Sequence, residues 1–76
     1  MRIKVFGPFG LARNLDEKGW LDMEEGATLG QAIHKIGLPT TFARIVRVAL
    51  NGQAQPMDTV LKDGDVISFF ALIYGG

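Results

Sequence analysis

The chain has 76 residues, of which 47% are hydrophobic and 21% are charged. This length fits one small domain, and this balance of residues is typical of a folded protein and not of a disordered one. Lysines and arginines number 8, and so do aspartates and glutamates, so a net charge of zero gives no general attraction to nucleic acid or anionic lipid. The lack of cysteine excludes disulfides, thiolate metal sites and a cysteine nucleophile.

The longest apolar stretch, residues 66–74, contains Ser68 and is too short for a membrane-spanning helix. The N-terminus does not resemble a secretory signal, because Lys4 interrupts its short apolar stretch. We therefore expect a soluble cytoplasmic protein with no membrane partner.

Two alternating segments near the start of the chain predict a hairpin. Residues 2–6 alternate charged and apolar side chains, which is typical of a half-buried strand. Gly7-Pro8 ends this strand, since proline cannot continue a strand ladder. Residues 20–24 alternate again, with Leu21 and Met23 on one face. Because only a polar loop separates the two segments, we expect them to pair antiparallel.

A short amphipathic helix is predicted after Thr28. Thr28 is a favourable N-cap, and Gln31 stands three residues later, which is the spacing of a capping box. Gly37 supplies a C-terminal stop. The apolar positions that follow the helical period are Leu29, Ala32, Ile33 and Ile36. A short helix is stabilised mainly by packing, so we expect this stripe to lie on a sheet.

The second half of the chain predicts strands over residues 45–50, 53–55 and 66–72. Asn51-Gly52 is a strong hairpin signal between the first two, because both residues tolerate a positive φ. Asp63-Gly64-Asp65 predicts a second tight turn before the last strand.

The last strand should divide its side chains between two faces. Ile67 and Phe69 should point into the core, whereas Ser68 and Phe70 should point away from it. One amphipathic helix and several strands with one apolar face each predict a two-layer α+β fold. We expect a single domain over residues 1–76.

Conventional catalytic or metal-binding residues are sparse. His34 is the one histidine and has no clustered carboxylates at ligand spacing, so we interpret it as a solvated helix residue. Asp63 and Asp65 lack the further oxygen ligands of a calcium loop, so we interpret them as turn residues that accept backbone hydrogen bonds. No glycine-rich segment matches a nucleotide-binding motif. We therefore expect this chain to hold no metal and no cofactor.

Basic residues could share one face of the sheet: Arg2, Lys4, Arg44 and Arg47. With zero net charge and no aromatic run among them, they are weak evidence for RNA binding. We expect no nucleic-acid partner.

The sequence ends in Gly75-Gly76. Glycine has no side chain, so a diglycine tail can lie extended in a narrow channel, with its carboxylate unhindered as a nucleophile toward an activated phosphate. The alternative is a frayed end without a role, since chain termini are often poorly ordered. The pattern of the residues before the tail distinguishes the two.

Four segments of the chain carry a family resemblance: Met23–Leu29, Asn51-Gly52, Leu61–Phe70 and Gly75-Gly76. In this order they resemble the MoaD/ThiS family, the sulfur-carrier branch of the ubiquitin-like β-grasp proteins. The resemblance implies an α+β fold with a mixed sheet of four to five strands packed on one main helix. It also implies a globular body over residues 1–72 and a flexible tail over residues 73–76.

The family resemblance implies that Gly76 is the reacting residue. An ATP-dependent enzyme of the ubiquitin-activating type adenylates its carboxylate, and sulfur then replaces an oxygen to give a thiocarboxylate. Gly75 lets the tail enter the partner's active site. The chain itself is then a carrier and not an enzyme, and the ATP belongs to the partner.

The resemblance further implies a biosynthetic enzyme that accepts the sulfur. The first candidate is the large subunit of molybdopterin synthase, in the molybdopterin or tungstopterin pathway, and the next is a thiazole synthase of the thiamine pathway. Two other functions stay open: a protein modifier conjugated through Gly76, and an interaction module without tail chemistry.

A partner surface is predicted beside the tail. Phe70, Leu72 and Tyr74 could form an apolar strip there, and such strips often bind partners. The alternative is that Phe70 packs beneath the first loop. The family commonly has prolines at the positions of Ala71 and Leu72, and a smaller residue in place of Tyr74. These departures leave the subfamily and the activating enzyme open.

Overall fold

The computed structural model describes residues 1–7, 14–37 and 46–71. They form one sheet of four strands and one helix. The elements are β1 (Arg2–Phe6), β2 (Trp20–Asp22), α1 (Leu29–Ile36), β3 (Val46–Leu50) and β4 (Val66–Ala71).

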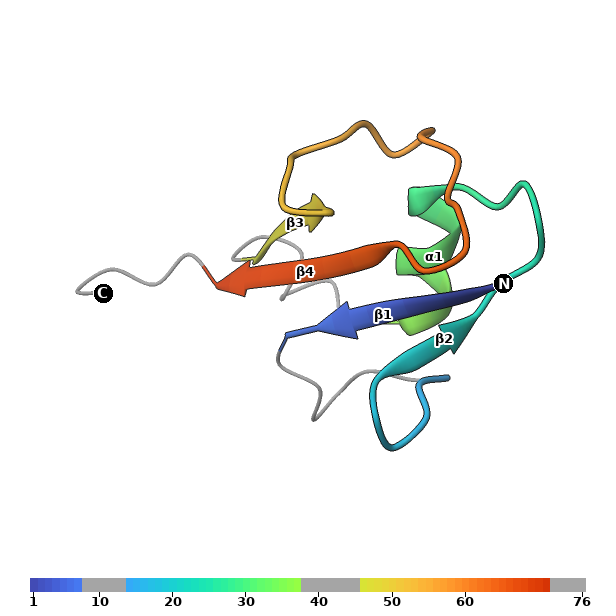
Figure 1. Cartoon of the computed structure of the whole chain (residues 1–76). Coiled ribbons are helices and arrows are strands. Elements are labelled where there is room, and N and C mark those ends of the chain that lie inside the picture. The colour runs from blue at the N-terminus through green and yellow to red at the C-terminus, as the bar shows by residue number, and fades with distance from the viewer. Residues whose placement is uncertain (8–13, 38–45, 72–76) are drawn as a thin grey trace.

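The strands lie in the order β2-β1-β4-β3, with α1 on one face of the sheet (Figure 1). The central pair, β1 and β4, is parallel, whereas β2 and β3 pair antiparallel on either side. The mixed sheet and the predicted hairpin of the first two strands are confirmed. The predicted α+β fold of the β-grasp type is also confirmed.

The helix begins and ends where the sequence predicts. The Thr28 side chain accepts from the Gln31 amide at 3.2 Å, and the Gln31 side chain accepts from the Thr28 amide at 2.9 Å. Gly37 ends the helix with a left-handed φ of 70°. The first two helical amides donate to carbonyls of the loop that leads into β4. The Leu29 amide donates to the Thr59 carbonyl, and the Gly30 amide donates to the Met57 carbonyl. The N-terminus of α1 is therefore closed by protein groups.

The core lies between α1 and the sheet. Its largest fully buried side chains come from both layers: Ile3, Val5, Leu21, Leu29, Ile36 and Ile67. Ala32, Leu50, Leu61 and Phe69 complete it. Of the predicted helical stripe, Ile33 is only half-buried and packs against the edge of this core.

Two predicted strands differ in extent from the observed ones. The predicted strand over residues 53–55 is reduced to a single bridge between Gln53 and Leu50. Asn51-Gly52 does form the turn, with φ of 52° and 83°, but Pro56 lacks an amide to continue the ladder. The second strand ends at Asp22 and not at residue 24, because its partner β1 begins at Arg2.

Candidate functional site

The sheet face that points away from α1 carries Phe70, a predicted partner-binding residue. Along β4, Ile67 and Phe69 are buried in the core, whereas the Phe70 side chain is 55% exposed. The predicted division of this strand between its two faces is confirmed. The alternative, in which Phe70 packs beneath the first loop, does not fit this exposure.

The end of β4 is the root of the predicted tail. β1 ends at Phe6, which pairs with Ser68, and β4 continues beyond this pair to Ala71 (Figure 1). Any continuation of the chain therefore starts at the end of the sheet where β1 also ends. The remaining predicted site residues lie outside the described residues: Leu72, Tyr74, Gly75 and Gly76.

A second exposed aromatic residue lies on the same face. The Phe6 side chain is 51% exposed, and Phe6 pairs with Ser68, two residues before Phe70. The Lys4 ammonium lies 5.5 Å from the centre of the Phe6 ring, so this ring already has a cation beside it. The sequence prediction missed Phe6, although strand alternation already placed it on the outer face with Arg2 and Lys4.

Two of the predicted basic residues contact the Trp20 ring of the sheet and groups of the loop that precedes it. The Arg2 guanidinium lies 3.1 Å from the Asp16 carboxylate and 4.7 Å from the centre of the Trp20 ring. The Lys4 ammonium lies 5.2 Å from the same ring and donates to the Lys18 carbonyl. Arg2 and Lys4 therefore each have interaction partners within this chain. Arg44 lies outside the described residues.

Asp16 shapes the loop that leads into β2. Its carboxylate accepts from the amides of Trp20 and Lys18 at 2.8 and 2.9 Å. These hydrogen bonds, that of Trp20 first, together with the positive charge of Arg2, hold the pKa of the Asp16 carboxyl below its ordinary value. Asp16 is therefore ionised at neutral pH and holds Arg2 over the Trp20 ring.

The family assignment follows from a match that runs through nearly the whole chain. The family model described as "ThiS family" matches residues 4–76. The chain belongs to the ThiS family. Members of this family are ubiquitin-like β-grasp sulfur carriers that do not catalyse reactions and bind no cofactor. ThiS-family carriers are generally activated by enzymes of the ubiquitin-activating type.

A solved structure has the same fold. The crystal structure of SAMP1 from Haloferax volcanii superposes with a TM-score of 0.60, at 23% sequence identity. The alignment covers 100% of this chain and 98% of that chain. This likeness supports the β-grasp fold of the ThiS-family chain. No curated protein sequence matches it significantly.

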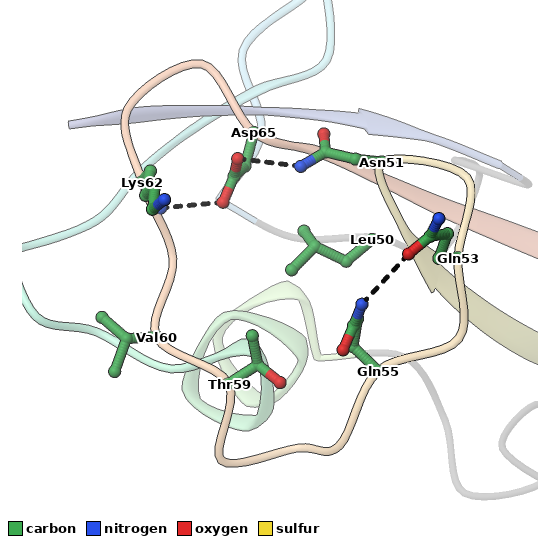
Figure 2. Close-up of a pocket in the computed structure, with 8 residues that line it drawn as sticks. All are labelled: Leu50, Asn51, Gln53, Gln55, Thr59, Val60, Lys62 and Asp65. Carbon is green, nitrogen blue, oxygen red and sulfur yellow. Dashed lines mark hydrogen bonds between the residues drawn. The ribbon is translucent and has the colours of Figure 1, made fainter.

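The turn before β4 is structural in this ThiS-family chain. The Asp63 carboxylate accepts from the Arg2 amide at 2.8 Å. Figure 2 shows Asp65 between Asn51 and Lys62: its carboxylate accepts from the Asn51 side chain at 2.9 Å and from the Lys62 amide at 2.8 Å. The predicted role of these aspartates as turn residues is confirmed. They tie β1, β3 and β4 together at the end of the sheet opposite the tail root.

A hollow of about 320 Å³ lies beside this turn, lined by polar side chains and by Leu50 and Val60 (Figure 2). The one carboxylate that lines the hollow, that of Asp65, already accepts the hydrogen bonds just described. The side-chain amide of Gln55 donates to that of Gln53 at 3.4 Å. The hollow therefore belongs to the packing of the turn.

Residues 1–7, 14–37 and 46–71 hold no group of three or more side chains that could bind a metal ion. Within the same residues, no helix is long and apolar enough to cross a membrane. His34 is exposed on α1, as its interpretation as a solvated residue predicts.

Proposed function

We propose that this ThiS-family protein carries sulfur on the carboxyl group of Gly76. The observation that supports this most is the family match, which extends through Gly76 itself. The exposed Phe70 supports it too, because it places an apolar contact close to the root of the tail.

The proposed reaction has two steps at the carboxyl group of Gly76. A carboxylate oxygen of Gly76 attacks the α-phosphorus of ATP in the partner enzyme, and pyrophosphate leaves. Sulfide-level sulfur, supplied by the pathway as hydrosulfide, then attacks the carbonyl carbon of the acyl-adenylate, the bond to AMP breaks, and loss of the sulfur-bound proton leaves a thiocarboxylate. The residues of the tail, 73–76, would supply reach, and Gly75 would let them enter a narrow channel.

The proposed docking strip consists of Phe70, Leu72 and Tyr74. These residues alternate along the chain, so in an extended tail their side chains lie on one face. In this proposal the strip holds the tail root against the adenylating enzyme while the glycines reach its active site.

For the sulfur acceptor we propose the molybdopterin or tungstopterin pathway first, with the large subunit of molybdopterin synthase as the partner. The support for this order is the resemblance of residues 65–70 to that subfamily. A thiazole synthase of the thiamine pathway is the next candidate. The family is typically cytoplasmic, so the proposal places the carrier in the cytoplasm.

The first experiment tests activation of the tail. The purified chain is incubated with the ubiquitin-activating-type enzyme of its source organism, ATP and Mg²⁺, and ATP–pyrophosphate exchange is measured. We expect exchange with the intact chain and none with a chain that lacks Gly76. Equal exchange by the two chains, or none with either, contradicts the proposal.

The second experiment separates the carrier from a protein modifier. Both begin with adenylation, but a modifier ends as an amide on lysine side chains. Peptides of other proteins from the source organism that carry the diglycine remnant on lysine would favour the modifier. Their absence, together with thiocarboxylate on Gly76, would favour the carrier.

A further inference from the structure

Arg47 on β3 differs from the other described cations of the outer sheet face. By strand register, Arg2 and Lys4 on β1 share this face with Arg47. Arg2 is paired with Asp16, and Lys4 is bound over the Trp20 ring. Arg47 is exposed, and among the described residues it forms neither a salt bridge nor a contact with an aromatic ring face.

Arg47 lies directly opposite Phe70 in the antiparallel pairing of β3 and β4. Side chains of such cross-strand pairs stand about 4.5–5.5 Å apart at their Cβ atoms, so a partner that covers Phe70 also meets Arg47. Arginine and aromatic residues are enriched at protein interfaces and in their strongest contacts. Arg47 and the 55% exposed Phe70 are therefore the types of residue that often dominate the binding energy of an interface.

The position of the pair relates it to the tail. Phe70 immediately precedes Ala71, the last described residue of β4. An enzyme that draws the following residues into its active site must cover this end of the sheet. Burying there a guanidinium that has no partner among the described residues would be costly unless the enzyme offers it an opposite charge.

We propose that Arg47 is a specificity-determining contact for the adenylating enzyme, which presents a carboxylate beside an apolar recess that receives Phe70. This inference rests on the proposed function. It adds a charged contact from β3 to the docking strip, and it requires a carboxylate on the partner.

The test measures ATP–pyrophosphate exchange by the source organism's adenylating enzyme as the concentration of the carrier varies. For Arg47→Glu we expect the KM for the carrier to rise roughly tenfold or more, with kcat little changed, because reversal of a charge at an interface repels the partner. Arg47→Lys should retain most of the affinity. The KM of the unaltered chain should rise with salt, and that of Arg47→Glu should rise less.

Lys62→Glu is the matched control, because it makes the same charge change on an exposed residue at the opposite end of β4. We expect its KM to stay close to that of the unaltered chain. Thermal unfolding of each variant shows whether the fold is intact, and Arg47→Ala supplies a second, milder variant.

Three outcomes would overturn the inference. One is an unchanged KM for Arg47→Glu while the intact chain is adenylated, in which case the proposed function stands. Another is an equal rise for Lys62→Glu, which would indicate general charge attraction. The third is normal adenylation of Arg47→Glu with slower sulfur transfer, which would assign Arg47 to the acceptor enzyme. Failure of the intact chain to be adenylated removes both proposals.

Discussion

Asp16 accepts hydrogen bonds from two backbone amides and from the Arg2 guanidinium, although its side chain is exposed. The sequence shows only a polar residue in a loop, so this role could not be predicted. It depends on the loop turning back so that the amides of Lys18 and Trp20 face one carboxylate.

The lowered pKa of Asp16 predicts a pH dependence of stability. A carboxyl with a lower pKa in the folded state stabilises the fold above its unfolded pKa, and this contribution is lost as pH falls through the folded pKa. The unfolded value of aspartate is about 3.9, so the loss occurs below roughly pH 4. In Asp16→Asn, urea unfolding should show a smaller fall in the free energy of unfolding between neutral and acid pH. If the free energy of unfolding falls equally in Asp16→Asn and in the unaltered chain, Asp16 does not contribute to the pH dependence of stability.

Phe6 and Phe70 show what alternation can and cannot predict for single residues. Alternation correctly placed Phe70 on the outer face. The same alternation puts Phe6 on the outer face with Arg2 and Lys4, but alternation alone does not show that half of its side chain is exposed. Arg47 was grouped with the other basic residues, and only the strand register separates it from those that have partners.

At the scale of elements, α1 was predictable because its signals are local. Thr28, Gln31 and Gly37 are read directly from the sequence, and the observed caps use all three. The absence of the predicted strand over residues 53–55 was not predictable, because it depends on the path of the following loop as well as on Pro56. That loop passes over the N-terminus of α1, where Met57 and Thr59 accept helical amides.

The capping box should contribute measurably to the free energy of unfolding. Thr28→Ala should lower the free energy of unfolding by about 1 kcal/mol, because the Gln31 amide loses its acceptor. Thr28→Ser keeps a hydroxyl and should cost much less. Denaturant unfolding of the two variants provides the comparison, and equal costs would mean that the hydroxyl is not the stabilising group.

At the scale of the whole molecule, the sheet has one face buried in the core and an opposite face that carries exposed aromatic side chains. Phe69 and Phe70 are neighbours in β4, yet one is 8% exposed in the core and the other is 55% exposed on the outer face. The parallel pairing of β1 with β4 could not be read from alternation, because it joins segments far apart in the chain. The family resemblance predicts a mixed sheet, but the structure is needed to show that β1 and β4 form its parallel pair.

This separation predicts opposite effects for adjacent substitutions. Phe69→Ala should lower the free energy of unfolding by about 3–5 kcal/mol, a large part of a small domain's stability. Phe70→Ala should change it by less than about 0.5 kcal/mol and should instead weaken adenylation. Thermal unfolding and the exchange assay together check both. Equal destabilisation by the two variants would mean that the faces are wrongly assigned.

In the proposed function, the group that carries sulfur is the carboxyl group of Gly76. The most direct measurement is the intact mass of the chain purified from its source organism, followed by fragmentation of its C-terminal peptide. The account predicts a fraction of molecules in which one oxygen of the Gly76 carboxyl group is replaced by sulfur, and none when the gene of the adenylating enzyme is deleted. A Gly76 carboxyl group that stays unmodified under all conditions, or a mature chain that extends beyond residue 76, would contradict it.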